Sequence, residues 1–159
     1  LASTTQANTA NVLRAFPFIV RTSFAIDRIQ FEVTTLLTGN CVVGIYNSNA
    51  SNYPNAKLVQ GTAASTGTTG LKTSTIAATL VADTLYWLCY NSDNAVVLRA
   101  VPIGAVPTVL GNAGTSGTNR QITGRTVAST YNATMPATYP AGATDLVAII
   151  PPLIIVRAT

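Results

Sequence analysis

The chain has 159 residues, of which 48% are hydrophobic and only 9% charged, with no histidine and a formal net charge of +4. This length predicts one domain with a substantial core. The lack of histidine excludes Ser-His-Asp and Cys-His catalysis and any zinc site that needs histidine. The Lys and Arg residues are scattered along the chain, so we expect no nucleic-acid partner. A surface made largely of Thr, Ser, Asn and Ala suits a protein that buries much of its surface in an assembly.

The N-terminal segment, residues 1–11, is polar and lacks apolar periodicity, so we expect an arm or lead-in there. The ordered domain is predicted to span residues 12–159. Phe16, Phe18 and Val20 share one face of its first strand. Pro17 within that strand favours an edge or lead-in position, because proline cannot donate to a ladder on both sides.

The clearest strand pattern lies in residues 26–34, where the apolar residues Ile29, Phe31 and Val33 alternate with polar ones. The turn formers Gly39 and Asn40 follow. Residues 41–47 form the next predicted strand, and its two faces carry Cys41, Val43 and Ile45 on one side and Val42, Gly44 and Tyr46 on the other. We interpret residues 26–47 as a β-hairpin.

Further strands are predicted at residues 57–61 and 71–80, separated by a Gly/Ser/Thr loop. Residues 85–90, Leu-Tyr-Trp-Leu-Cys-Tyr, are apolar on both faces, as is typical of a central strand covered on both sides. Trp87 is therefore assigned to the core. Residues 86–101 are interpreted as a second hairpin.

Loops dominate the C-terminal part. Residues 111–124 form a long Gly/Thr/Asn stretch, a length that indicates a functional loop or one held by a partner. Strands are expected at 125–131, 146–150 and 153–157. The apolar run 146–156 is too short to span a membrane and is interrupted by Pro151-Pro152, so no membrane insertion is expected. Short strands between frequent turn signals predict an all-β antiparallel β-sandwich.

The residues that could carry chemistry are few. The complete acidic inventory is Asp27, Glu32, Asp83, Asp93 and Asp145. Asp83 and Asp93 stand at predicted turns, where Asp serves the backbone, and Asp27 and Glu32 fall on opposite strand faces. We therefore expect no enzyme, no metal site and no cofactor. The two cysteines, Cys41 and Cys89, are expected to be buried free thiols, although a disulfide between them stays open.

A sugar-binding site is the better physical alternative, because aromatic rings can stack on sugars while amides reach hydroxyls. The candidate glycan contacts are the loop residues Tyr53, Tyr131, Tyr139, Asn52 and Asn132. The competing interpretation is that these tyrosines pack at strand ends or between subunits.

Several strand sequences together resemble a known module. They are Arg28-Ile-Gln-Phe-Glu-Val-Thr-Thr35, Val43-Gly-Ile-Tyr-Asn47, Lys57-Leu-Val59, Thr69-Gly-Leu-Lys72 and Leu85-Tyr-Trp-Leu88. In this order they are similar to the β-sandwich domains of tail-fibre and other virion proteins of tailed bacteriophages. The segments 135–143 and 151–157 are similar to the ends of such chains.

The resemblance implies a jelly-roll-like sandwich, frequent homotrimers and a location on the virion, at the tail or the capsid surface. The leading role that it implies is a tail-fibre or receptor-binding module that recognises a host-surface glycan. The alternative is a capsid decoration (cement) protein or head fibre that stabilises the shell. The partners would be copies of itself and other virion proteins, and the candidate assembly contacts are Asn112, Arg120 and Arg125.

Overall fold

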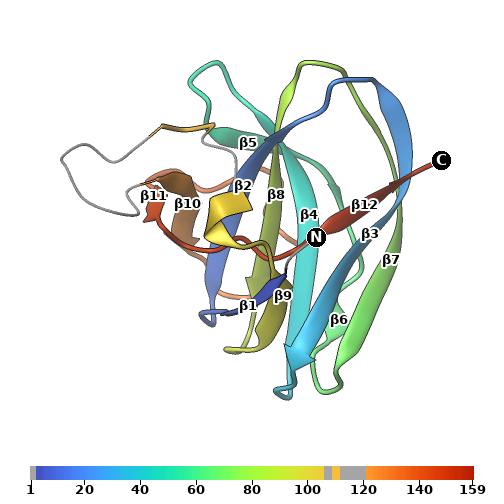
Figure 1. The fold of residues 1–159 in the computed structure, drawn as a ribbon, viewed down its shortest axis with the longest axis vertical. Coiled ribbons are helices and arrows are strands. Elements are labelled where there is room, and N and C mark those ends of the chain that lie inside the picture. The colour runs from blue at the N-terminus through green and yellow to red at the C-terminus, as the bar shows by residue number, and fades with distance from the viewer. Residues whose placement is uncertain (1–2, 106–108, 112–120) are drawn as a thin grey trace.

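Two antiparallel β-sheets face each other in the computed structural model (Figure 1), which describes residues 3–105, 109–111 and 121–159. The prediction of an all-β sandwich is confirmed, and its jelly-roll connectivity stays a prediction. The elements in chain order are β1 (Thr4–Ala7), β2 (Val12–Ile19), β3 (Phe24–Thr35), β4 (Asn40–Ser48), β5 (Pro54–Gln60), β6 (Ala64–Ser65), β7 (Gly70–Leu80), β8 (Leu85–Ser92), β9 (Val97–Ala100), the 3₁₀ turn η1 (Ile103–Ala105), β10 (Ile122–Ala128), β11 (Thr144–Val147) and β12 (Ile155–Ala158).

The first sheet, here called sheet A, is built around the long strand β3. Its order is β1-β9-β3-β12, and β7 pairs with the other side of β3. The alternation predicted for residues 26–34 is confirmed, since Ile29, Phe31 and Val33 are buried. Sheet A therefore presents one apolar face to the interior and one polar face to the outside.

The second sheet, sheet B, has the order β11-β10-β2-β8-β4-β5, with β6 beside β4. Strand β8 lies in its middle, and both of its faces are buried. Tyr86 and Tyr90 point into the core between the sheets, whereas Trp87 and Cys89 belong to a second apolar cluster on the outer face of sheet B. The predicted central strand, with Trp87 in the core, is confirmed.

The outer face of sheet B is covered by the segment of residues 129–143, which we call the cover segment. It places the buried side chains of Met135 and Tyr139 on the second cluster. Its backbone also lies along the edge of β5, where the N–H of Lys57 donates to the carbonyl of Ala137 and the N–H of Tyr139 donates to Asn55, both at 2.8 Å. The cover segment thus buries one sheet face and closes one sheet edge.

Both predicted hairpins are wrong. Strand β3 belongs to sheet A and β4 to sheet B; likewise, β8 belongs to sheet B and β9 to sheet A. The turns at residues 36–39 and 93–96 therefore carry the chain from one sheet to the other. A period-two pattern shows that a strand has one buried face. It does not show whether the next strand pairs beside it in the same sheet or packs against it from the facing sheet.

The predicted N-terminal arm is wrong for most of its length. Residues Thr4–Ala7 form β1, which pairs with β9, and the N–H of Asn8 donates to the carbonyl of Val96. Strand β2, expected at an edge, lies between β8 and β10. Its pairing with β10 ends at Ala15, so Pro17 has a strand neighbour only at Trp87 on the β8 side, which is how the sheet accommodates a proline.

Candidate functional site

The ring of Tyr139 lies inside the molecule. Its side chain is 3% exposed, and its hydroxyl donates to the carbonyl of Leu13 at 3.0 Å. The ring packs edge-on against Tyr46 and Tyr53, with centroid distances of 5.6 and 5.9 Å. The prediction of an exposed sugar-stacking ring is therefore wrong for Tyr139. The competing interpretation, a tyrosine that packs against a strand, describes it.

Tyr53 anchors the far end of the cover segment. Its hydroxyl donates to the carbonyl of Pro140 at 2.7 Å and accepts from the N–H of Ala143 at 3.0 Å. Both hydrogen-bonding functions of this half-buried hydroxyl are thus used within the chain. A sugar could reach only the part of the ring that remains exposed.

Tyr131 lies at the start of the cover segment, and its N–H donates to the side chain of Asn11 at 2.8 Å. Its hydroxyl is buried and has no hydrogen-bond partner among the described residues. Burial, together with the nearby negative charge of Asp93, raises the pKa of this hydroxyl. The polar end of Tyr131 therefore points into the protein rather than toward a ligand.

The two candidate asparagines are exposed but separated. Asn52 stands just before β5 in the left-handed region, with φ of 52°. The side chain of Asn132 accepts from the N–H of Thr134, and the neighbouring carbonyl of Ala133 is bonded by Gln60 at the other end of β5. A strand of this length spans roughly 20 Å. The structure therefore does not bring the five candidate glycan contacts together at one site.

The candidate assembly contacts are only partly described. Asn112 and Arg120 lie outside the described residues. Arg125, on β10, forms an ion pair with Asp145 on β11, and its carbonyl lies 3.4 Å from the hydroxyl of Tyr139. Arg125 is engaged within the chain, and no described feature tests its contact with a neighbour.

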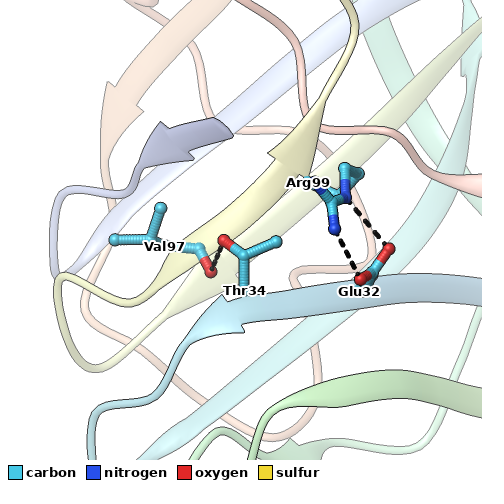
Figure 2. Close-up of polar contacts among 4 residues, drawn as sticks. All are labelled: Glu32, Thr34, Val97 and Arg99. Atoms are coloured by element: carbon cyan, nitrogen blue, oxygen red, sulfur yellow. Dashed lines mark hydrogen bonds and ion pairs between the residues drawn. The ribbon is translucent and has the colours of Figure 1, made fainter. Parts of the chain in front are cut away.

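The best-formed charged pair lies on the outer face of sheet A (Figure 2). Arg99 of β9 donates to both carboxylate oxygens of Glu32 of β3, at 3.1 and 2.9 Å. Beside this ion pair, the hydroxyl of Thr34 donates to the carbonyl of Val97 at 3.2 Å. The hydrogen bonds from Arg99 lower the pKa of Glu32. This bidentate geometry holds an ionised carboxylate and does not poise it for proton transfer.

The other four carboxylates are also engaged. Three form ion pairs and the fourth, Asp93, accepts from the N–H of Asn40 at 2.7 Å; the ion pairs are Asp27–Arg157, Asp83–Arg21 and Asp145–Arg125. Hydrogen bonds from Arg157 lower the pKa of Asp27. Within the described part of the chain, no three side chains of His, Cys, Asp or Glu gather into a group that could hold a metal ion.

No family model and no curated protein sequence matches this chain.

Both cysteines are free and buried, as expected. Cys41 lies in the core between the sheets and Cys89 lies in the outer cluster of sheet B, so they occupy opposite faces of that sheet. Burial raises the pKa of both thiols well above the ordinary value. They are therefore apolar packing groups and not nucleophiles.

An apolar cleft opens between the sheets near the C-terminal segment, with a volume of about 490 Å³. Its walls come mainly from β2 and the residues around Pro151-Pro152, β8 contributes Leu88, and Arg21 is the charged residue that lines it. The sequence interpretation missed this cleft, because strand patterns do not show how far apart the ends of two sheets lie. The residues that line the cleft are Phe16, Pro17, Phe18, Ile19, Arg21, Leu88, Val101, Ala105, Val109, Thr123, Pro151, Pro152, Leu153 and Ile154.

No helix in the described ranges has the length and hydrophobicity to cross a membrane.

Proposed function

We propose that this chain is a structural component of a tailed-bacteriophage particle and works through non-covalent contacts. The strand sequences that resemble phage virion modules support this proposal, and so does the sandwich in which they lie. The engagement of all five carboxylates in ion pairs or backbone hydrogen bonds supports a binding role over a hydrolytic one.

The observation that carries the proposal is the asymmetry between the two outer faces. The outer face of sheet B is covered by the chain itself, whereas on the outer face of sheet A every second residue of β7 is exposed. This open face carries exposed β7 residues, among them Thr73, Thr75 and Thr79, and charges that are tied in pairs such as Glu32–Arg99. A face with little free charge costs little to desolvate, which suits contact with another protein.

This geometry favours the decoration or head-fibre role, in which the chain holds neighbouring virion proteins. The receptor-binding role is the second candidate. It is supported by the exposed amides of Asn52 and Asn132, each next to a partly exposed tyrosine ring. In that role the two loops would bind glycan separately, since they lie at opposite ends of β5.

Location on the source particle tests the proposal directly. Electron microscopy with a gold-labelled antibody to this chain is expected to show label over the shell. Label at the tail tip would support the receptor-binding role instead, and particles that carry the chain at neither place would contradict the proposal.

A binding assay then separates the two roles. Arg28 is exposed on β3, opposite Thr75 of β7, and is therefore on the open face. We expect Arg28→Glu to reduce rebinding of the purified chain to depleted particles, whereas the double variant Asn52→Ala/Asn132→Ala binds as the unmodified chain does. The reverse pattern, measured on host cells, would favour receptor binding.

A further inference from the structure

Strand β7 is an open sheet edge. It pairs with β3 alone, and in Figure 1 it forms the outer margin of sheet A. The other strands that end a sheet are short or closed: β1, β11 and β12 have four residues each, and β5 is bridged to the cover segment at Ala56–Thr138. With eleven residues, β7 is the longest open edge in the described part of the chain.

This edge carries few of the features by which proteins block edge pairing. Its sequence, Gly-Leu-Lys-Thr-Ser-Thr-Ile-Ala-Ala-Thr-Leu, contains no proline and one charge, that of Lys72. The amine of Lys72 donates to the hydroxyl of Thr68 at 2.6 Å. The ladder with β3 has one β-bulge, at which the two β7 residues Ile76 and Ala77 face the single residue Asp27, and it is continuous on both sides of the bulge. Such an edge can accept a further antiparallel strand.

We propose that the β7 edge pairs with the β7 edge of a second copy of this chain, antiparallel about a two-fold axis at Thr75. In this register Gly70 lies opposite Leu80 of the second copy, and the bulge of β7 at Ile76 and Ala77 falls next to the axis in each copy. Thr73 lies opposite Ala77, and Leu71 lies opposite Thr79. The two five-stranded A sheets would become one continuous sheet.

Exposed apolar side chains identify the second copy as the partner. Leu71, near the start of β7, and Val81, which directly follows its last residue, are 56% and 52% exposed. In the antiparallel register, Leu71 of each copy becomes a diagonal neighbour of Val81 of the other copy, so the two-fold axis creates this contact twice. The pairing would therefore cover two of the most exposed apolar side chains among the described residues with each other.

Charge agrees with this choice. The single charge of the strand, Lys72, lies opposite the apolar Ala78 of the second copy, so the antiparallel pair brings no like charges together. A parallel pairing in register would place the two Lys72 side chains side by side, which is destabilising. An isologous two-fold contact closes on itself and yields a dimer. It therefore differs from the trimer that the family resemblance implies.

The test uses the isolated chain and does not depend on a location in the virion. Sedimentation velocity over a concentration series is expected to show a monomer–dimer equilibrium. Thr75→Lys places two lysines opposite each other and is expected to raise the dimer dissociation constant by about tenfold or more. The matched control is Thr5→Lys, an exposed threonine on the short edge strand β1, which should leave the constant unchanged.

Cysteine crosslinking tests the register. Thr75→Cys is expected to give a disulfide-linked dimer under mild oxidation, since directly opposed residues lie within disulfide range. Thr73→Cys should not, because its copies would be about 13 Å apart along the strands. The native cysteines are buried and do not interfere. A monomer at all concentrations, an oligomer that Thr75→Lys leaves intact, or equal crosslinking at both positions would overturn the proposal.

Discussion

Removing the hydroxyl of Tyr139 tests whether this residue is a packing group of the cover segment. In Tyr139→Phe the ring stays, and the hydrogen bond of 3.0 Å to the carbonyl of Leu13 is lost. A buried hydrogen bond of this kind contributes about 1 kcal/mol net. Tyr139→Ala also removes a ring that is 3% exposed, which costs about 3–5 kcal/mol. For a chain of this size, 1 kcal/mol corresponds to a change in Tm of roughly 2–4 °C.

The assay is equilibrium urea unfolding followed by the fluorescence of Trp87, the one tryptophan of the chain, which is fully buried in the same cluster. The m-value should stay constant while the midpoint falls, with Tyr139→Ala well below Tyr139→Phe. Asn132→Ala, on the exposed part of the same segment, is the control and should change stability by less than about 0.5 kcal/mol. A loss below about 1 kcal/mol for Tyr139→Ala would refute the packing role.

Three further predictions follow from single contacts. A Cβ on Gly124 would lie 2.2 Å from a backbone oxygen of β2, so Gly124→Ala should cost about 2–3 kcal/mol in urea unfolding, while Gly67→Ala, whose Cβ has room, should cost far less. The pKa of Glu32 is lowered by its arginine partner, so its stabilisation is present above the ordinary pKa of 4.5 and is lost as pH falls through the folded-state value. The free energy of unfolding, measured at a series of pH values from 7 to 3, should fall less steeply for Glu32→Gln than for the unmodified chain. An equal fall for the two proteins would contradict this. Cys41 and Cys89 should react with a thiol reagent only after denaturation, and labelling of the native chain would disprove their burial.

The sequence predicted the strands well because their faces alternate. Ile29, Phe31 and Val33 are buried as expected, and the doubly apolar strand around Trp87 has a covered face on each side. These predictions succeed because burial of one face leaves a local, period-two signal. Pro17 was also informative, since its part of β2 has a partner strand on the β8 side only.

The sequence carries no comparable local signal for which strands pair with each other. Whether residues 36–39 turn back within a sheet or cross to the facing sheet depends on contacts with distant residues, such as the hydrogen bond of Asn40 to Asp93. The assignment of Tyr139 as an exposed ring failed for the same reason. Tyr139 occurs in a Pro- and Thr-rich loop that looks exposed in sequence, yet its hydroxyl binds Leu13, 126 residues earlier. A loop that lies on a sheet cannot be distinguished from a free loop by composition alone.

The cover segment also determines when, during synthesis, the apolar outer face of sheet B becomes buried and protected from aggregation. Its contacts close very long loops: the hydroxyl of Tyr46 reaches the carbonyl of Pro136, 90 residues later, and Gln60 reaches Ala133, 73 residues later. Such closures are slow, and a chain that grows from its N-terminus completes β2, β4 and β8 well before it makes them. Until residues 129–143 leave the ribosome, Trp87 and Tyr46 lie on an apolar face with no cover. We therefore expect the nascent chain to be most prone to aggregation, and most dependent on chaperones, just before residues 129–143 are made.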